Sequence, residues 1–316
     1  MQKKISIKVL PSEAADHHSL QRIIAQACNI SSDRISGINF LKQSIDARGK
    51  QTWIHLTINV FIDEPYQPTE LIPLQLKDVG HSDKKVIVIG AGPAGLFAAL
   101  TLIEQGIKPV VLERGKNVRE RRRDLAAINK QGIVNPESNY CFGEGGAGTY
   151  SDGKLYTRST KRGYVYKILS TLVHFGADEK ILYEAHPHIG TNKLPHIITA
   201  IRHHIVQCGG EVHFEQKVTD FKISNNEIKV VITANGNSWH ADAFILATGH
   251  SARDILRTAK SFARGMDGNT TRPLAALKAT PRQRSMFIRS RLRTGMCWWT
   301  FSPFAMACLI HRESSD

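Results

Sequence analysis

Two glycine-rich stretches of this chain share the spacing G-x-G-x-x-G. The first runs from Gly90 to Gly95 and the second from Gly143 to Gly148. Glycines at this spacing let main-chain N–H groups approach a phosphate closely, because no side chain stands in the way. Two working turns would indicate two bound dinucleotides, so the elements around each stretch decide what chemistry it supports.

The first stretch lies within a predicted βαβ unit. The β-branched run 86–89 is typical of a strand buried on both faces of a parallel sheet. A helix is expected over 96–105, where Gly106 ends it, and a second strand over 109–112. A strand therefore enters the turn and a helix leaves it, as a dinucleotide-binding turn requires.

The glycines of the first stretch have distinct predicted roles. Gly90 permits the tight turn, Gly92 lets the backbone approach a pyrophosphate, and Gly95 lets the helix pack on the strand. The pyrophosphate would then lie at the N-terminus of the helix. The cofactor contacts predicted for this turn are Gly90, Ala91, Gly92, Pro93, Ala94 and Gly95. The alternative is a glycine-rich turn that binds nothing.

An acidic residue and a short downstream strand narrow the choice of dinucleotide. Glu113 stands 23 residues after Gly90 and can accept hydrogen bonds from ribose hydroxyls, which favours NAD or FAD over NADP. The apolar run that ends in Ala247, Thr248 and Gly249 is typical of flavoproteins with two dinucleotide folds. We therefore predict FAD, with the backbone of these last three residues close to it.

The second stretch matches the spacing but lacks the elements that would make it a second dinucleotide turn. Residues 137–140 do not form a buried apolar run, and the next acid after Asp152 is Asp178. Five glycines between 143 and 153 can instead expose N–H groups to an anion, or let a flat ring pass close to the main chain. A surface loop that binds nothing is the alternative.

Four motifs resemble those of a bacterial family of FAD-dependent dehydrogenases, distant relatives of the glutathione-reductase-like flavoproteins. The motifs are FGEGGAGTYSDGKL at 142–155, SIDAR at 44–48, GTNKL at 190–194 and ATGHSARD at 247–254. The resemblance extends over about residues 5–254, and Asn192 departs from the aspartate that the family pattern leads us to expect. It implies an α/β fold with a Rossmann-like FAD-binding domain of the two-dinucleotide-fold type.

The resemblance also implies where the cofactor lies. The 143–154 loop would contact the same FAD as the first turn, near its pyrophosphate and ribityl chain. Residues of this loop expected to bind FAD are Gly145, Gly146, Ala147, Gly148, Ser151, Asp152 and Lys154. Arg114 would bind beside Glu113, and Val218 would contact the adenine through its backbone.

Other polar groups have competing interpretations. His250 follows the Ala-Thr-Gly turn and is a weak candidate to tune the flavin or move a proton, or it makes a structural hydrogen bond. Cys141 adjoins the second stretch and is expected to be a buried thiol; a redox role is the alternative, although no other cysteine is near in sequence. The basic run 119–123 is interpreted as a helix face near the anionic cofactor or in solvent, because no aromatic residues interleave it as nucleic-acid binding would favour. No metal site is expected among the histidines.

The chain is predicted to comprise an α+β domain at 1–78, the FAD-binding domain at 79–254 and an irregular basic tail at 255–316. Alternating apolar residues predict strands over 5–9 and 54–62, and helical spacing predicts a helix over 20–27. Five scattered cysteines without a C-x-x-C pair argue against a disulfide framework or zinc site, and cytoplasmic localisation is expected. No apolar run reaches the roughly 18 residues of a membrane helix.

The tail accounts for more than half of the net charge of +14, since its last 62 residues hold nine Arg and two Lys against three acids. We interpret the segment from about residue 255 as a frameshifted or rearranged end of the chain. Three functions follow: a flavin-dependent oxidoreductase of unknown small-molecule substrate, a truncated flavoprotein that binds FAD weakly without turnover, and a protein whose basic tail binds RNA or a membrane surface. The first is favoured, with NAD(P)H as a candidate reductant that has no Rossmann turn of its own, and no nucleic-acid or membrane partner is expected.

Overall fold

The computed structural model describes residues 1–151, 153–155, 164–224, 227–258 and 308–310. The chain divides into two compact units. The first comprises Met1–Pro73 and later residues that include Tyr166–Ile189, and the second includes Leu74–Gly153 and the chain from Gly190 onward. The first unit is thus built from segments that lie far apart in the sequence, which the sequence patterns did not indicate.

The first unit contains an antiparallel sheet covered on one face by a helix. Its elements are β1 (Gln2–Val9), α1 (Pro11–Ala15), α2 (His17–Cys28), β2 (Ile35–Asp46) and β3 (Trp53–Ile62), with strand order β1-β3-β2. The period-2 apolar residues of β3 lie in the core beneath α2, which confirms the predicted strands and helix. The prediction did not include β2, whose two register shifts interrupt the apolar alternation.

A later segment completes the first unit. It contains α5 (Val165–His174) and the 3₁₀ turn η4 (Glu179–Leu182). At the edge of β2, the Gln43 N–H donates to the Tyr183 carbonyl, 2.8 Å, and the Gln43 carbonyl accepts from Ala185, 2.8 Å. The Tyr183 ring stacks on Phe40, 5.2 Å between ring centroids. The free edge of β2 is therefore partly paired and covered by this segment.

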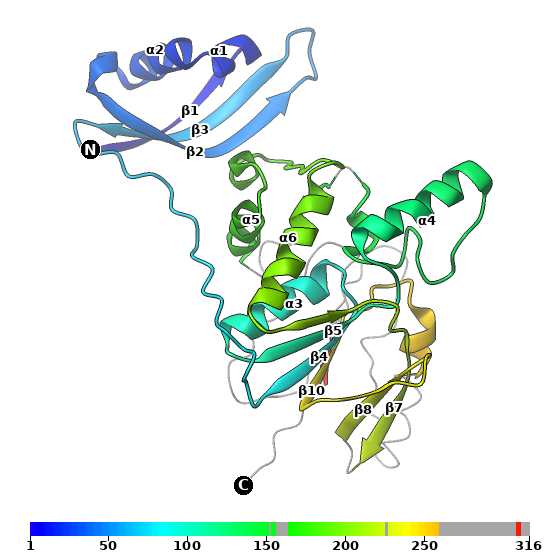
Figure 1. The fold of residues 1–316 in the computed structure, drawn as a ribbon. Coiled ribbons are helices and arrows are strands. Elements are labelled where there is room, and N and C mark those ends of the chain that lie inside the picture. Colours follow the sequence, from blue (N-terminus) through cyan, green and yellow to red (C-terminus); the bar gives the residue numbers. More distant parts are fainter. Residues whose placement is uncertain (152, 156–163, 225–226, 259–307, 311–316) are drawn as a thin grey trace, which may run out of the picture. The chain divides into compact units, whose positions relative to one another are not determined.

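The second unit has a largely parallel sheet between two layers (Figure 1). Its parallel strands are β4 (Lys85–Ile89), β5 (Lys108–Leu112), β6 (Glu211–His213) and β10 (Ala243–Leu246), while β11 (Cys308–Ile310) pairs antiparallel to β10. On one face lie α3 (Pro93–Glu104) and α6 (Leu194–Gln207); on the other lies the antiparallel sheet of β7 (Val218–Ser224), β8 (Glu227–Thr233) and β9 (Ser238–His240). The predicted βαβ unit and buried strands are confirmed.

Three of the parallel strands end at one edge of this sheet. Gly90 follows β4, Glu113 follows β5 and Ala247 follows β10. Helix α3 begins at Pro93, three residues earlier than predicted, because Gly92 is its N-cap and proline is preformed for the first helical position. The first glycine stretch therefore forms the N-terminus of α3, at the edge where open α/β sheets bind ligands.

Candidate dinucleotide-binding site

The first glycine turn is packed so closely that side chains would not fit. Gly90 has φ +109°, and a Cβ there would lie 2.5 Å from the Ala247 carbonyl oxygen. A Cβ on Gly95 would lie 1.8 Å from the Gly90 oxygen. The turn is thus held between the ends of β4 and β10 and the first turn of α3. The tight turn at Gly90 and the close packing at Gly95 agree with the roles that the spacing predicted, whereas the contact of Gly90 with the end of β10 was not predicted.

Glu113 joins the two glycine stretches. Its carboxylate is buried, and Oε2 accepts from the Ala91 N–H at 2.8 Å. Oε1 accepts from the N–H groups of Gly115 at 2.9 Å and Gly143 at 3.0 Å. Since each carboxylate oxygen offers about two lone pairs, Oε1 is fully used and Oε2 retains one acceptor position.

The second glycine stretch lies directly on the first turn. The Gly145 N–H donates to the Ala91 carbonyl at 2.8 Å, and a Cβ on Gly146 would lie 3.4 Å from the Gly92 Cα. The stretch forms a loop with the 3₁₀ turn η2 (Gly146–Gly148), and no strand occurs at 137–140, as predicted. No described atom lies within 4 Å of the Cβ position of Gly148, so this side of the loop is open.

Side chains of helix α4 (Val118–Gln131) and helix α6 hold this loop in place. Arg121 of α4 is buried, and its guanidinium donates to carbonyls of the loop. The Glu144 carboxylate is also buried; it accepts from the Val118 N–H at 2.8 Å and from Arg202 Nε at 2.7 Å. Burial raises the pKa of Glu144, although these two donors act against that rise.

The Ala-Thr-Gly turn carries a buried hydroxyl that no described residue satisfies. The Ala247 N–H continues the sheet by donating to the Ile89 carbonyl at 2.8 Å. The next residue, Thr248, has a buried Oγ1 with no hydrogen-bond partner in the described part of the chain. Such an atom is costly to bury unless a ligand supplies the missing bond. The open side of Gly148 and the orphaned Thr248 hydroxyl both fit a polar ligand at this edge of the sheet.

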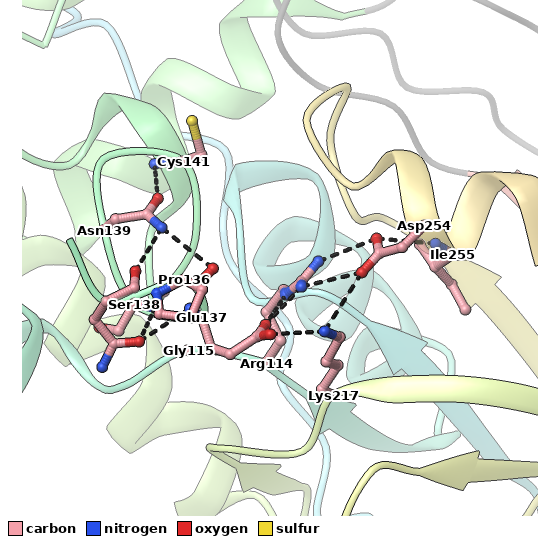
Figure 2. A network of polar contacts seen from close by, with 12 residues as sticks. Arg114, Gly115, Pro136, Glu137, Ser138, Asn139, Cys141, Lys217, Asp254 and Ile255 are labelled. Atoms are coloured by element: carbon pink, nitrogen blue, oxygen red, sulfur yellow. Dashed lines mark hydrogen bonds and ion pairs between the residues drawn. The ribbon is translucent and has the colours of Figure 1, made fainter.

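Arg114, the residue after Glu113, belongs to a network of two cations and two carboxylates (Figure 2). Arg114 donates to Glu137 at 2.7 Å and to Asp254 at 3.2 Å, and its guanidinium lies 4.0 Å from the centroid of the Phe142 ring. Lys217 donates to Glu137 at 2.6 Å and lies 3.7 Å from Asp254. Arg114, which we predicted to contact the cofactor, is therefore held in place by protein carboxylates.

The remaining predicted residues are placed as follows. Val218 is buried at the start of β7, and Ser151 donates to the Gly148 carbonyl at 2.8 Å. Lys154 groups with the first unit, where it forms an isolated bridge with His188, and Asp152 lies outside the described residues. The side chain of His250 is exposed.

Other sequence interpretations concern groups outside the two glycine stretches. Cys141 is exposed, so the expectation of a buried thiol was wrong. Within the described part of the chain, no group of three or more His, Cys, Asp or Glu could hold a metal ion. None of the described helices combines the length and the apolar character needed to cross a membrane. Most of the predicted tail, from residue 259 to 307 and from 311 to 316, lies outside the described residues.

The fold and this edge of the sheet define a dinucleotide-binding protein of the Rossmann-like class. Comparison with known families agrees: the model described as an FAD binding domain matches residues 83–242, half of the chain. The chain belongs to this family, and FAD is its cofactor. Residues 1–61 match a domain of unknown function, and residues 211–297 match the model for glucose inhibited division protein A.

Individual relatives share different parts of the chain. An uncharacterized protein of Clostridium beijerinckii is 35% identical over 274 residues, which cover 79% of this chain and 51% of the relative. This chain therefore spans about half the length of that relative. The glutamate synthase [NADPH] small chain of Halomonas elongata is 35% identical over 85 residues, 22% of this chain and 16% of that protein. Among solved structures, Thermovibrio ammonificans THI4 aligns with 17% identity over 56% of this chain and 62% of its own, with a TM-score of 0.36.

Proposed function

We propose that this protein is an FAD-dependent oxidoreductase that holds a single FAD in one cradle made by both glycine stretches. One observation carries the proposal: the Glu113 carboxylate accepts hydrogen bonds from the N–H of Ala91 in the first stretch and the N–H of Gly143 in the second. Two stretches joined in this way present their backbones to one ligand. This arrangement supports the interpretation that the second G-x-G-x-x-G is part of the same site and binds no second dinucleotide.

The pyrophosphate belongs at the N-terminus of α3 in this proposal. Its charge would be stabilised by the unpaired N–H groups of the first helical turn and by the helix dipole. Residues assigned to it are Gly90, Ala91, Gly92, Pro93, Ala94 and Gly95. Glu113 would accept one ribose hydroxyl through the free position on Oε2, which is fewer than an unengaged carboxylate would accept.

The other contacts divide between the two ends of the cofactor. Arg114 and the backbone of Val218 are assigned to the adenine end, next to the ion network. On the flavin side we assign Gly145, Gly146, Ala147, Gly148, Ser151, Ala247, Thr248 and Gly249. The Thr248 hydroxyl would gain from FAD the hydrogen bond that the described residues do not provide.

The bound flavin supplies hydride or electron transfer, and the protein supplies position and electrostatic environment. We propose a small molecule as substrate. His250 is the candidate to hold or move a proton, because its exposed side chain directly follows the Ala-Thr-Gly turn. Replacement His250→Asn should slow flavin reduction or reoxidation while the Kd for FAD stays the same; unchanged rates in both directions would remove this assignment.

An absorbance spectrum of the purified protein tests the proposed function. After incubation with FAD and gel filtration, flavin bands at about one FAD per chain are expected. Anaerobic addition of NADH or NADPH should then bleach these bands, with FAD as the acceptor. A colourless protein would contradict FAD binding. Bound flavin that dithionite reduces but that neither nucleotide reduces would contradict an NAD(P)H-dependent oxidoreductase and support a flavoprotein without turnover.

A further inference from the structure

Helix α4 carries four arginines, and only one of them is turned inward. Arg119, Arg122 and Arg123 are exposed, whereas the side chain of Arg121 is 1% exposed. Its neighbours in the buried stripe of the helix are Val118 and Leu125. A fully buried guanidinium is costly unless nearly all of its N–H groups find acceptors, so its surroundings indicate what it does.

All hydrogen-bond acceptors of Arg121 lie in one loop and are neutral. Nη1 donates to the carbonyls of Glu144 and Gly146, both at 2.8 Å, and more weakly to the Gly143 carbonyl and the Thr149 hydroxyl, both at 3.3 Å. Nε donates to the Asn139 carbonyl at 2.9 Å, and Nη2 donates to the Tyr140 carbonyl at 3.2 Å. One side chain thus holds the loop 139–149 along its length.

These bonds fix the direction of the peptide groups in the second glycine stretch. In a trans peptide the N–H points opposite to the C=O, so a carbonyl drawn toward Arg121 turns the following N–H away from it. The Glu144 carbonyl points at Arg121, and the Gly145 N–H of the same peptide reaches Ala91 in the first turn. By the same geometry, the bond to the Gly146 carbonyl turns the Ala147 N–H to the opposite side of the loop.

The charge of Arg121 has the sign that an anionic ligand requires. Burial lowers the pKa of Arg121, and the nearby carboxylates Glu113 and Glu144 act against that shift. A guanidinium nevertheless stays protonated at neutral pH. Glu144 is paired with Arg202, and Arg121 itself contacts only neutral oxygens, so no carboxylate forms a direct ion pair with Arg121.

We infer that Arg121 is a positioning residue for the FAD pyrophosphate: it holds the second glycine stretch so that N–H groups of this loop face the phosphates, and it places a positive charge behind them. The inference rests on the proposed function, because the anion is the pyrophosphate of the proposed cofactor. Arg121 does not touch the ligand itself. It acts through the peptides of the loop.

Variants of α4 test this inference. Arg121→Lys keeps the charge but loses the planar fork, Arg121→Met removes the charge, and Arg122→Met is the matched change on the exposed face. The Kd values of FAD, ADP and AMP are measured for each variant, together with amide hydrogen exchange of 139–149 and urea unfolding of the apoprotein. If Arg121→Met does not fold, Thr149→Val removes one oxygen of the same network and should act in the same direction.

The expected pattern is specific to the second phosphate. Arg121→Lys should weaken FAD and ADP by about tenfold or more, as loss of charge-assisted hydrogen bonds predicts, and AMP by clearly less. Hydrogen exchange should accelerate in 139–149 only, and Arg122→Met should match the unaltered protein. Equal weakening of all three nucleotides, or unchanged FAD and ADP affinity, would overturn the inference. If the unaltered protein binds no FAD, the proposed function fails instead, whatever the variants do to the loop.

Discussion

The Glu113 carboxylate holds both glycine stretches before any ligand is considered. Three main-chain N–H groups converge on it within 3.0 Å, and they come from Ala91, Gly115 and Gly143. In dinucleotide sites of this type, the acidic residue accepts hydrogen bonds from the ribose hydroxyls. In this protein the same acid also maintains the cradle, so its removal should affect folding and binding together.

Replacement Glu113→Gln tests this double role. The substitution replaces one carboxylate oxygen with an NH₂ group, which cannot accept a hydrogen bond. The backbone N–H group or groups that now donate to that oxygen would stay buried without an acceptor. We expect the apoprotein to lose about 1.5–3 kcal/mol of unfolding free energy, the usual range for a hydrogen bond to a charged group. Urea unfolding measures this loss. Glu120→Gln, an exposed carboxylate on α4, is the control and should change little. Unchanged apoprotein stability together with weaker FAD binding would show that Glu113 serves the ribose alone.

At the residue scale, the residues that belong to a known motif could be predicted from the sequence, whereas the buried Arg121, which belongs to no motif, could not. Gly90, Gly95 and Glu113 were predictable because their roles follow from fixed spacing around a turn. Arg121 was hidden in a run of charged residues. Its signal was present, since 118, 121 and 125 follow helical spacing and the other two are apolar. Nothing local indicates that a buried arginine will be satisfied by carbonyls of a loop about 20 residues away.

At the scale of elements, three loops that follow β4, β5 and β10 meet at one edge of the sheet. The sequence predicted this meeting because parallel strands bring their carboxyl ends together. The 143–149 loop could not be placed in this way. Its position depends on hydrogen bonds to Ala91, Lys116 and Glu113, which no periodicity reveals.

Two glycines of the cradle should respond oppositely to substitution. A Cβ at Gly90 would clash with Ala247 and would require a φ of +109°, so Gly90→Ala should destabilise the apoprotein. A Cβ at Gly148 has no described atom within 4 Å beyond its chain neighbours, so Gly148→Ala should leave urea unfolding of the apoprotein nearly unchanged. Gly148→Val, which extends further from the loop, should weaken FAD binding by about tenfold or more. FAD titration and unfolding of these variants check this. If Gly148→Val binds FAD normally, the cofactor does not lie against this part of the loop.

The ion network predicts a pH dependence of stability. Burial acts to raise the pKa of Glu137, but hydrogen bonds from Lys217 and Arg114 outweigh it and hold the pKa below its ordinary value. A lowered carboxylate pKa contributes stability that is present at neutral pH and is lost as the pH falls below about 4.5, the ordinary value, through the folded value. Because Glu137 is 35% exposed, this contribution should be modest, about 1 kcal/mol or less.

Urea unfolding of the apoprotein at pH 7 and at pH 4 measures this effect. The unaltered protein should be more stable than Glu137→Gln at pH 7, and the difference should shrink at pH 4. Glu179→Gln, an exposed carboxylate in the first unit, should show no comparable trend. A difference between the unaltered protein and Glu137→Gln that stays constant across this range would mean that Glu137 acts by packing and not by charge.

At the scale of the whole molecule, the least predictable feature is the divided first unit. Its strands β1 and β3 and its helix α2 could be predicted, because apolar residues recur at regular spacing in half-buried strands and helices. That residues 166–189 belong to the same unit could not be predicted. Their link to it depends on single contacts, such as the hydrogen bond that the Ile72 N–H donates to Ser170 Oγ at 2.8 Å and the stacking of Tyr183 on Phe40. Contacts between distant segments leave no periodic trace in a sequence.

Loss of one of these contacts should destabilise the first unit selectively. Tyr183→Ala removes the ring that stacks on Phe40, and we expect a loss of about 1–3 kcal/mol for this half-buried aromatic. Hydrogen exchange should accelerate in β2, whose edge pairs with the same segment. The Kd for FAD should not change, because both glycine stretches, Glu113 and Thr248 belong to the second unit. Coupled loss of FAD affinity would show that the first unit supports the cradle.

The divided first unit also constrains how such a chain can be rearranged in evolution. The chain leaves the first unit, builds the two glycine stretches and α4, and returns with the segment that covers the edge of β2. A single crossover between genes would exchange the β-sheet without its cover, or the cover without its sheet. An exchange that keeps the sheet with its cover has to carry both segments, and with them the two glycine stretches encoded between them.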